Sequence, residues 1–127
     1  MAKALGIGGI FFRSINPEGL ANWYRTWLKF PGDSGSYSSF LPTTIPEKGF
    51  SVWSPFKKDS DYFGNPNQVF MVNLMVDDLD GTLKQVAEGG AEVIPETEEY
   101  DYGRFGWFVD PDGNRVELWQ PADASEQ

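Results

Sequence analysis

The glutamate at position 117 carries the clearest potential for chemistry, and Arg115 and Trp119 flank it at alternating positions near the end of the chain. A carboxylate that faces an aromatic cavity can act as a general base or accept a hydrogen bond from a ligand. Arg13 can hold a ligand carboxylate or phosphate through its planar guanidinium, or it can pair with Glu117 in a structural ion pair. Both alternatives stay open, and Glu117 is the one candidate catalytic residue.

The composition excludes several other chemistries. The 127 residues include no cysteine and no histidine, which excludes disulfide scaffolds, thiol nucleophiles, Ser-His-Asp triads and histidine-based zinc sites. Lys and Arg together number 10 against 19 Asp and Glu, so the formal net charge is −9. Such an acidic protein is a poor partner for nucleic acids or anionic membranes. We therefore expect a small-molecule partner, with no nucleic acid and no membrane.

Aromatic residues are abundant, with 5 Trp, 5 Tyr and 10 Phe. This content predicts either a large core or a cavity lined by aromatic rings. The sequence shows no convincing targeting segment, and no run approaches the roughly 18 apolar residues of a membrane span. The expected location is the cytoplasm.

The elements that position these residues follow from periodicity and capping signals. Residues 7–14 predict a strand. Asn16 and Pro17 then form a helix start, apolar residues recur at helical spacing as far as Leu28, and a Pro-Gly pair at 31–32 ends the helix.

The second half of the chain repeats this order. It predicts a strand at 69–76, a helix that starts at the aspartates 77–78 and stops at Gly89-Gly90, and strands at 91–94, 104–109 and 115–120. A turn at 110–114 joins the last two strands. We therefore predict an α+β fold of two βαβββ units whose curved mixed sheets surround a cavity. The single domain, 1–127, comprises the units 5–54 and 69–121, a linker at 55–68 and a tail at 122–127. The two middle strands of the first unit are expected within 33–48, but the sequence does not fix their bounds.

Strand alternation sorts the side chains onto two faces of these sheets. Val116 and Leu118 should pack on the helices, because they alternate along the strand with Arg115, Glu117 and Trp119. The repeat also predicts a strand that contains Ser51 and Trp53. The same rule, carried across the repeat, places eight side chains on the other face: Phe11, Arg13, Trp53, Met71, Asn73, Met75, Glu117 and Trp119. They line a ligand cavity, fill a second hydrophobic core, or form a dimer contact.

Four aromatic residues, two of them already named and two of them new, bear on that cavity. Trp53 and Trp119 occupy equivalent places in the two units, so their indoles could sandwich a planar or cationic ligand. Trp107 is a candidate ligand contact, but the sequence does not decide whether Trp107 and Phe105 face the cavity or the helices. Tyr102 ends an acidic stretch, 96–102, which is either a lid that favours cationic ligands or, as such charge runs usually are, a solvated loop.

The order of these motifs resembles the vicinal oxygen chelate superfamily, which includes glyoxalase I, extradiol dioxygenases, fosfomycin-resistance enzymes and bleomycin-resistance proteins. The resemblance runs from about Leu5 to Pro121. Its most specific part is Asp-Pro-Asp-Gly-Asn-Arg-Val-Glu-Leu at 110–118, supported by Gly-Ile-Gly-Gly at 6–9 and Phe-Ser-Val-Trp-Ser-Pro-Phe at 50–56. The resemblance implies the fold predicted above and a homodimer with two cavities.

The resemblance also implies where a divalent metal would bind. The superfamily's ligand positions fall on Gly9, Ser51, Met71 and Glu117, and only the last is a good ligand for a hard cation. We therefore expect no metal or other cofactor, and a protein that binds a small aromatic or cationic molecule. Two alternatives are a metal-dependent lyase or dioxygenase of the same superfamily, and an interaction module without a ligand. Whether the chain is an enzyme stays open.

Overall fold

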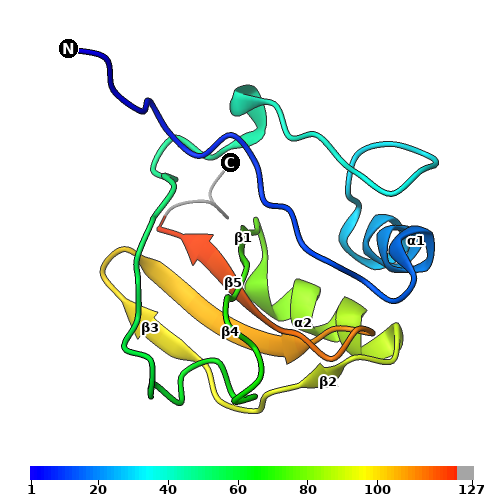
Figure 1. The fold of residues 1–127 in the computed structure, drawn as a ribbon. Helices are drawn as coiled ribbons and strands as arrows, with labels where there is room; N and C mark the ends of the chain where they lie inside the picture. The colour runs from blue at the N-terminus through cyan, green and yellow to red at the C-terminus, as the bar shows by residue number, and fades with distance from the viewer. Residues whose placement is uncertain (123–127) are drawn as a thin grey trace.

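The computed structural model describes residues 1–122, so the predicted tail lies, apart from its first residue, outside the described part of the chain. The sheet has five strands, and its main path runs β1-β5-β4-β2 (Figure 1). β1 pairs with β5 in parallel, and all other pairs, including that of β3 with β4, are antiparallel. The strands are β1 (Asn73–Met75), β2 (Glu92–Val93), β3 (Glu98–Tyr100), β4 (Gly103–Val109) and β5 (Arg115–Pro121). The fold is α+β, as the sequence predicts.

Both predicted helices form and are capped as expected. In α1 (Pro17–Leu28) the side chain of Asn16 accepts a hydrogen bond from the backbone N–H of Gly19, and Lys29 ends the helix in the left-handed region at φ 57°. In α2 (Leu79–Glu88) the Asp78 carboxylate takes the same capping role. A short 3₁₀ helix spans Pro42–Thr44. No helix within residues 1–122 has the length and apolar character needed to cross a membrane.

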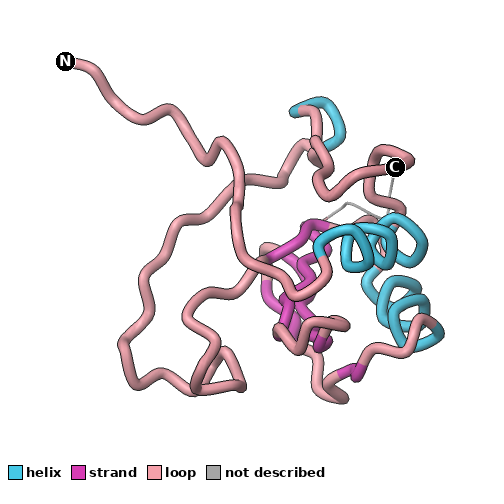
Figure 2. The backbone as a smooth tube through the Cα atoms, turned by 45° about the vertical axis from the view of Figure 1, so that its right-hand side comes forward, coloured by secondary structure: helices cyan, strands magenta, loops and turns pink. Residues whose placement is uncertain are grey.

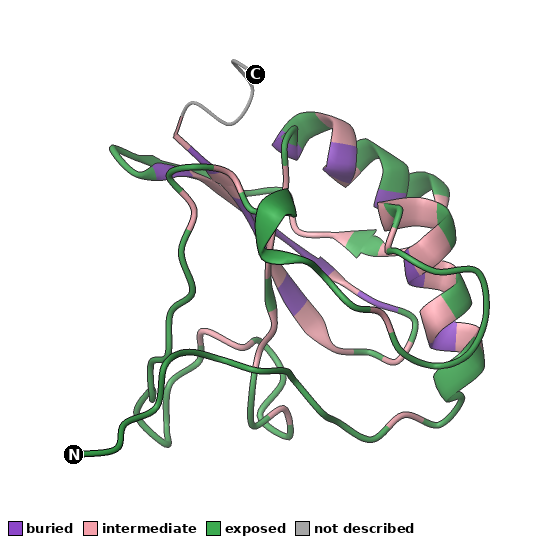
Figure 3. Ribbon diagram, turned by 90° about the horizontal axis from the view of Figure 1, so that it is seen from above, coloured by how far each residue is buried: buried purple, intermediate pink, exposed green. Residues whose placement is uncertain are grey.

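The two helices and one face of the sheet enclose the core (Figure 3). Val116 and Leu118 of β5 and Phe108 of β4 are buried there, against Leu79 and Val86 of α2. The prediction that Val116 and Leu118 face the helices is therefore confirmed. Leu20 and Tyr24 bring α1 into the same cluster.

The turn between β4 and β5 is anchored to α1 through a buried carboxylate. Asp110 accepts hydrogen bonds from the backbone N–H groups of Asp112 and Asn114, both at 3.0 Å, and from the Tyr24 hydroxyl at 2.9 Å. Burial raises the pKa of Asp110 despite these three donors. The predicted turn at 110–114 thus has its own network of hydrogen bonds, which fixes where β5 begins.

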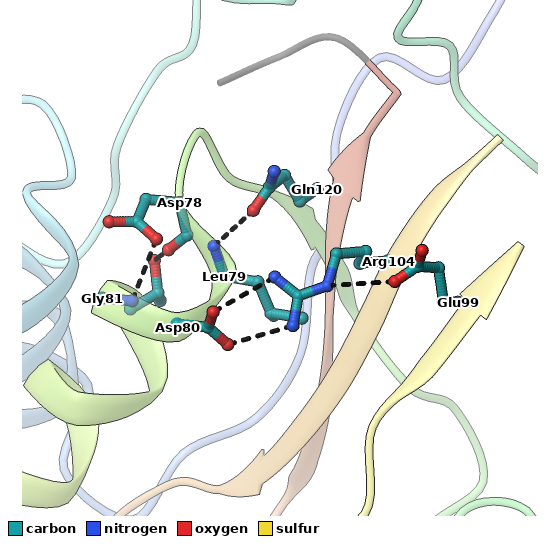
Figure 4. Close-up of polar contacts among 8 residues, drawn as sticks. Asp78, Leu79, Asp80, Gly81, Glu99, Arg104 and Gln120 are labelled. Atoms are coloured by element: carbon teal, nitrogen blue, oxygen red, sulfur yellow. Dashed lines mark hydrogen bonds and ion pairs between the residues drawn. The ribbon is translucent and has the colours of Figure 1, made fainter. Parts of the chain in front are cut away.

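A second set of polar contacts ties the start of α2 to the far end of the sheet (Figure 4). Arg104 of β4 donates to both carboxylate oxygens of Asp80, at 3.1 and 3.2 Å, and also lies near Glu99 of β3. The hydrogen bond from Arg104 lowers the pKa of Asp80. Gln120 accepts a hydrogen bond from the Leu79 backbone N–H at 2.7 Å. These contacts hold the helix layer in register with β4 and β5.

The first predicted unit is only partly formed. Within the described residues, none before Asn73 belongs to a β-strand, so the strands expected at 7–14, within 33–48 and at 51–54 are corrected to loop (Figure 2). A strand needs a neighbour to pair with its backbone, and glycine in a strand weakens it. Gly8 and Gly9 interrupt the first of these segments, and the Ser, Gly and Pro residues of 33–48 leave it without a partner.

The acidic stretch at 96–102 requires the opposite correction. We expected a solvated loop there, yet residues 98–100 form β3, which pairs with β4 in the register Glu98↔Phe105 and Tyr100↔Gly103. Its side chains are exposed, as on an edge strand. The pairing rests on backbone hydrogen bonds, to which exposed acidic side chains are no obstacle.

Candidate functional site

Glu117 lies at the centre of β5, with one hydrogen-bond donor on each neighbouring strand. It pairs in register with Asn73 of β1 and with Trp107 of β4. The Asn73 amide donates to Oε1 at 2.6 Å, and the Trp107 indole N–H donates to Oε2 at 3.0 Å. Glu117, Asn73 and Trp107 therefore form one cluster. Alternation had placed the first two on one face and left the face of Trp107 undecided.

The structure also settles which side chains of β4 share this face. Trp107 points to Glu117, and Phe105 stacks on Trp119 with ring centroids 6.0 Å apart and planes 4° from parallel. Phe108, one position along, is fully buried against the helices. The odd-numbered side chains of β4 thus line the Glu117 face, which alternation alone could not decide.

Tyr62, in the predicted linker, supplies a third donor that sequence reasoning missed. Its hydroxyl donates to Oε2 of Glu117, and its ring stacks on Phe56 and meets Trp107 edge-on at 6.1 Å. Burial, followed by the hydrogen bond to Glu117, raises the pKa of Tyr62, so the phenol stays a donor at neutral pH. No periodic signal could have found Tyr62, because it lies in a loop.

Trp119 is packed into the Glu117 face of the sheet and leaves almost no surface exposed for a ligand. It is only 4% exposed, its ring meets Phe50 edge-on at 4.9 Å, and its indole N–H donates to the carbonyl oxygen of Tyr102 at 3.0 Å. The side chain of Tyr102 is exposed and stacks on Tyr100. Trp119 and Tyr102 thus meet through a backbone contact, at the end of the sheet where β3 turns into β4.

The remaining predicted site residues are not brought to Glu117. Phe11 and Trp53 are 95% and 78% exposed, so the expected sandwich of Trp53 and Trp119 does not form. Arg13 is exposed, and the ion pair with Glu117 is replaced by the three neutral donors described above. Met71 and Met75 are half-buried beside or within β1. The physical cause is shared: the segments that carry Phe11, Arg13 and Trp53 have no strand to pair with.

A cavity of about 290 Å³ lies on the Glu117 face, where the linker crosses the start of β5. Gln68 anchors the linker there, because its side chain accepts from the backbone N–H of Arg115 and donates to the backbone carbonyl of Arg115, both at 2.8 Å. The Arg115 guanidinium lies 6.0 Å from the centre of the Trp107 ring. The cavity is lined by Phe63, Gly64, Asn65, Gln68, Glu92, Ile94, Val109, Gly113 and Arg115.

The residues present do not fit a divalent metal. The groups around Glu117 meet it as hydrogen-bond donors: the Trp107 indole N–H and the Tyr62 phenol are not usual ligands for a hard cation, and Asn73 turns its NH₂ group, not its carbonyl oxygen, toward Glu117. Among the superfamily's other ligand positions, Gly9 has no side chain and Met71 offers a thioether. Across residues 1–122 no three carboxylates gather in a way that could hold a metal ion.

Comparison with known families gives one match that spans most of the chain. A family model described as "Glyoxalase-like domain" matches residues 9–119, which include both helices, the paired strands and the cluster around Glu117. No curated protein matches the chain.

Several solved structures are similar over parts of their length. TnmS3, an antibiotic-binding protein from Streptomyces, shares 35% identity over 40% of this chain and 41% of its own, with a TM-score of 0.35. A member of the glyoxalase/bleomycin resistance protein/dioxygenase superfamily from Sphaerobacter thermophilus shares 32% identity over 39% of this chain and 40% of its own, also at 0.35. A protein of unknown function from Agrobacterium tumefaciens shares 20% identity over 92% of this chain and 98% of its own, at 0.47. The chain thus spans about two fifths of the length of the first two structures.

Proposed function

Because the chain belongs to the glyoxalase-like domain family of the vicinal oxygen chelate superfamily, we propose that it binds a small aromatic molecule, without a metal ion, on the Glu117 face of its sheet. The observation that carries the proposal is the cavity of about 290 Å³ between the linker and the start of β5. Ligand sites are typically concave, largely apolar and supplied with a few polar groups that fix orientation. The cavity has Phe63, Ile94 and Val109 as apolar walls, with Asn65 and Arg115 as polar ones.

The aromatic preference rests on Phe63, an aromatic residue that lines this cavity, and on the rings packed behind it. Phe63 lies within 5.3 Å of Phe56, which stacks on Tyr62, and Tyr62 meets Trp107 edge-on. Trp107 in turn lies beneath the Arg115 guanidinium. A planar ligand that enters beside Phe63 therefore meets ring edges and faces, for which aromatic pairs contribute about 0.5–1.5 kcal/mol beyond burial of area.

The hydrogen bonds to Glu117 support a binding role, with Oε1 accepting one of them and Oε2 accepting two. A carboxylate has about four lone-pair positions, and three donors already occupy Glu117. A general base needs a free oxygen directed at the proton that it removes. We therefore assign Glu117 the role of holding Asn73, Tyr62 and Trp107 in place, so that Trp107 presents a fixed wall to the ligand. A metal ion has no part in the proposal, because the donor groups around Glu117 do not suit one.

The test is a titration with three single-ring compounds of the same shape, benzoate, benzamide and benzamidine, followed by NMR of the five indole N–H groups. We expect at least one compound to shift the Trp107 indole signal, assigned with Trp107→Phe, while the signal of the exposed Trp53 stays in place as an internal control. EDTA should leave the affinity unchanged, since no metal takes part. The proposal fails if none of the three compounds moves the Trp107 signal, or if EDTA abolishes the shift.

We further propose that the chain forms a homodimer with one such cavity in each protomer. Its accessible surface is 9366 Å², more than a third above the roughly 6,800 Å² typical of a compact monomer of this mass. Much of the excess is apolar and lies in two segments before β1, at residues 5–15 and 50–56, which carry exposed side chains such as Leu5, Phe11, Ile15 and Trp53. A second copy would cover these segments.

Light scattering after size-exclusion chromatography tests the dimer. We expect a mass of about twice the 14.3 kDa of one chain at micromolar concentration. Phe11→Ser combined with Ile15→Ser should shift the mass toward that of one chain, since both side chains are exposed and contribute nothing to the helix-side core. A single-chain mass for the unmodified protein at tens of micromolar would contradict the dimer.

A further inference from the structure

Arg115, at the edge of the cavity, is a cation with no carboxylate partner among the described residues. It projects from the first position of β5 on the Glu117 face and lines the cavity directly. No carboxylate within residues 1–122 forms an ion pair with it, whereas Arg104, at the far end of the neighbouring strand, is held by Asp80. The Nε atom of Arg115 is shut off from solvent and has no hydrogen-bond acceptor among the described residues. The guanidinium is therefore not fully satisfied by the protein, and an acceptor in the cavity can pair with the part of it that lines the cavity.

The surroundings hold the Arg115 side chain in place. Its guanidinium lies over the Trp107 ring, and both backbone polar groups of Arg115 are bonded to the side chain of Gln68. Gly64 approaches so closely that a Cβ atom there would lie 2.9 Å from Nη1, and its φ of +80° suits glycine. Because the guanidinium is already ordered, an anion that binds to it loses little side-chain entropy.

We propose that Arg115 is the specificity-determining residue of the cavity, and that the ligand carries a single carboxylate which pairs with this guanidinium while its ring lies beside Phe63. The inference rests on the proposed function, and it replaces the expectation of a cationic ligand. Glu92 lines the same cavity, but it is exposed, so water screens its charge more strongly than that of the partly enclosed Arg115. The presence of that second, acidic wall favours a monocarboxylate over a more highly charged anion.

The net charge of the chain would produce the opposite order of ligand affinity from the one that a local cation produces. With a formal net charge of −9, the protein as a whole attracts cations and repels anions. Without a local site, the order of affinity for the three single-ring compounds would therefore be benzamidine, benzamide, benzoate. A preference for benzoate requires a local cation.

The experiment measures dissociation constants for benzoate, benzamide and benzamidine from the Trp107 indole signal in four proteins. In the unmodified chain we expect benzoate to bind about tenfold more tightly than benzamide, as a charge-assisted hydrogen bond allows. Arg115→Gln should remove that tenfold preference and leave the affinity for benzamide within about twofold. Arg115→Lys should keep only part of the preference, because lysine retains the charge but not the planar set of donors. Arg104→Gln is the matched control, because it removes the same charge from a site that contacts α2, and it should leave the preference intact.

Three outcomes overturn the inference. Benzamide or benzamidine that shifts Trp107 at the same concentration as benzoate shows a ligand site without an anion subsite, and the proposed function then stands. An Arg104→Gln variant that loses the benzoate preference as fully as Arg115→Gln shows an effect of net charge. If no compound shifts Trp107, the proposed function fails together with this inference. A urea unfolding curve for Arg115→Gln shows whether the variant is still folded, so that a loss of binding can be told from a loss of structure.

Discussion

Replacing Trp119 by alanine should lower the free energy of unfolding by about 3–5 kcal/mol, the range for removing a large buried aromatic side chain. Trp119 is 4% exposed, stacks on Phe105, meets Phe50 edge-on and donates a hydrogen bond to the Tyr102 carbonyl. The substitution leaves a cavity against both rings and leaves the Tyr102 carbonyl with only its 3.3 Å hydrogen bond from the Ala122 backbone N–H. Urea unfolding followed by circular dichroism measures the loss.

Trp53→Ala is the matched control for this variant, because it makes the same chemical change at a side chain that is 78% exposed. It should change the free energy of unfolding of one protomer by no more than about 0.5 kcal/mol. Trp119→Phe, which keeps a ring but not the N–H donor, should fall between the two. If Trp119→Ala proved as mild as Trp53→Ala and weakened only the binding of benzoate, the indole would be an open ligand contact, as strand alternation first suggested.

The second half of the chain could be predicted best where its signals are local. Asp78 caps α2, Gly89 and Gly90 stop it, and the turn at 110–114 carries its own hydrogen bonds, so these boundaries follow from neighbouring residues. The strand predicted at 69–76 is shorter, since β1 spans only Asn73–Met75, and β3 was not predicted. Alternation then places Glu117 and Asn73 on one face, since the side-chain period of a strand is two. The structure confirms this placement through the hydrogen bond between them.

The first half could not be predicted in the same way, because strands depend on a distant partner. Residues 7–14 and 51–54 have strand-like side chains, yet no neighbouring segment pairs with them in the described structure. A repeat in the sequence could indicate that the two halves correspond, but it does not supply the backbone partner that a strand requires. Phe11, Arg13 and Trp53 were assigned to the site through that correspondence, and they lie away from Glu117 for this reason.

The parts of the site that sequence reasoning missed belong to the linker. Tyr62 contacts β5 through one side-chain hydrogen bond and Gln68 through two, at separations of 55 and 47 residues along the chain. A loop residue has no period that reveals what it touches. Arg115 differs, because alternation had already placed it on the Glu117 face, and only the three-dimensional structure shows that no carboxylate of residues 1–122 pairs with it.

Gly103→Ala should lower the free energy of unfolding by about 2–4 kcal/mol, because this position joins backbone strain to a steric clash. Gly103 opens β4 with a φ of +140°, and a Cβ atom there would lie 2.3 Å from the Gln120 carbonyl oxygen and 2.5 Å from Nε1 of Trp119. Neither neighbour can move freely. The carbonyl belongs to β5, and the indole is packed between two rings.

Gly113→Ala separates the two contributions to that loss. Gly113 has a φ of +84° in the turn between β4 and β5, but a Cβ atom there would meet nothing within 4 Å. The strain of the left-handed region alone should cost about 1–2 kcal/mol. A larger loss for Gly103→Ala, together with a changed near-ultraviolet circular dichroism signal from Trp119, would show that the indole depends on the missing side chain at 103. Equal losses for the two variants would mean that Trp119 is packed loosely enough to move aside, which contradicts its close packing against Phe50 and Phe105.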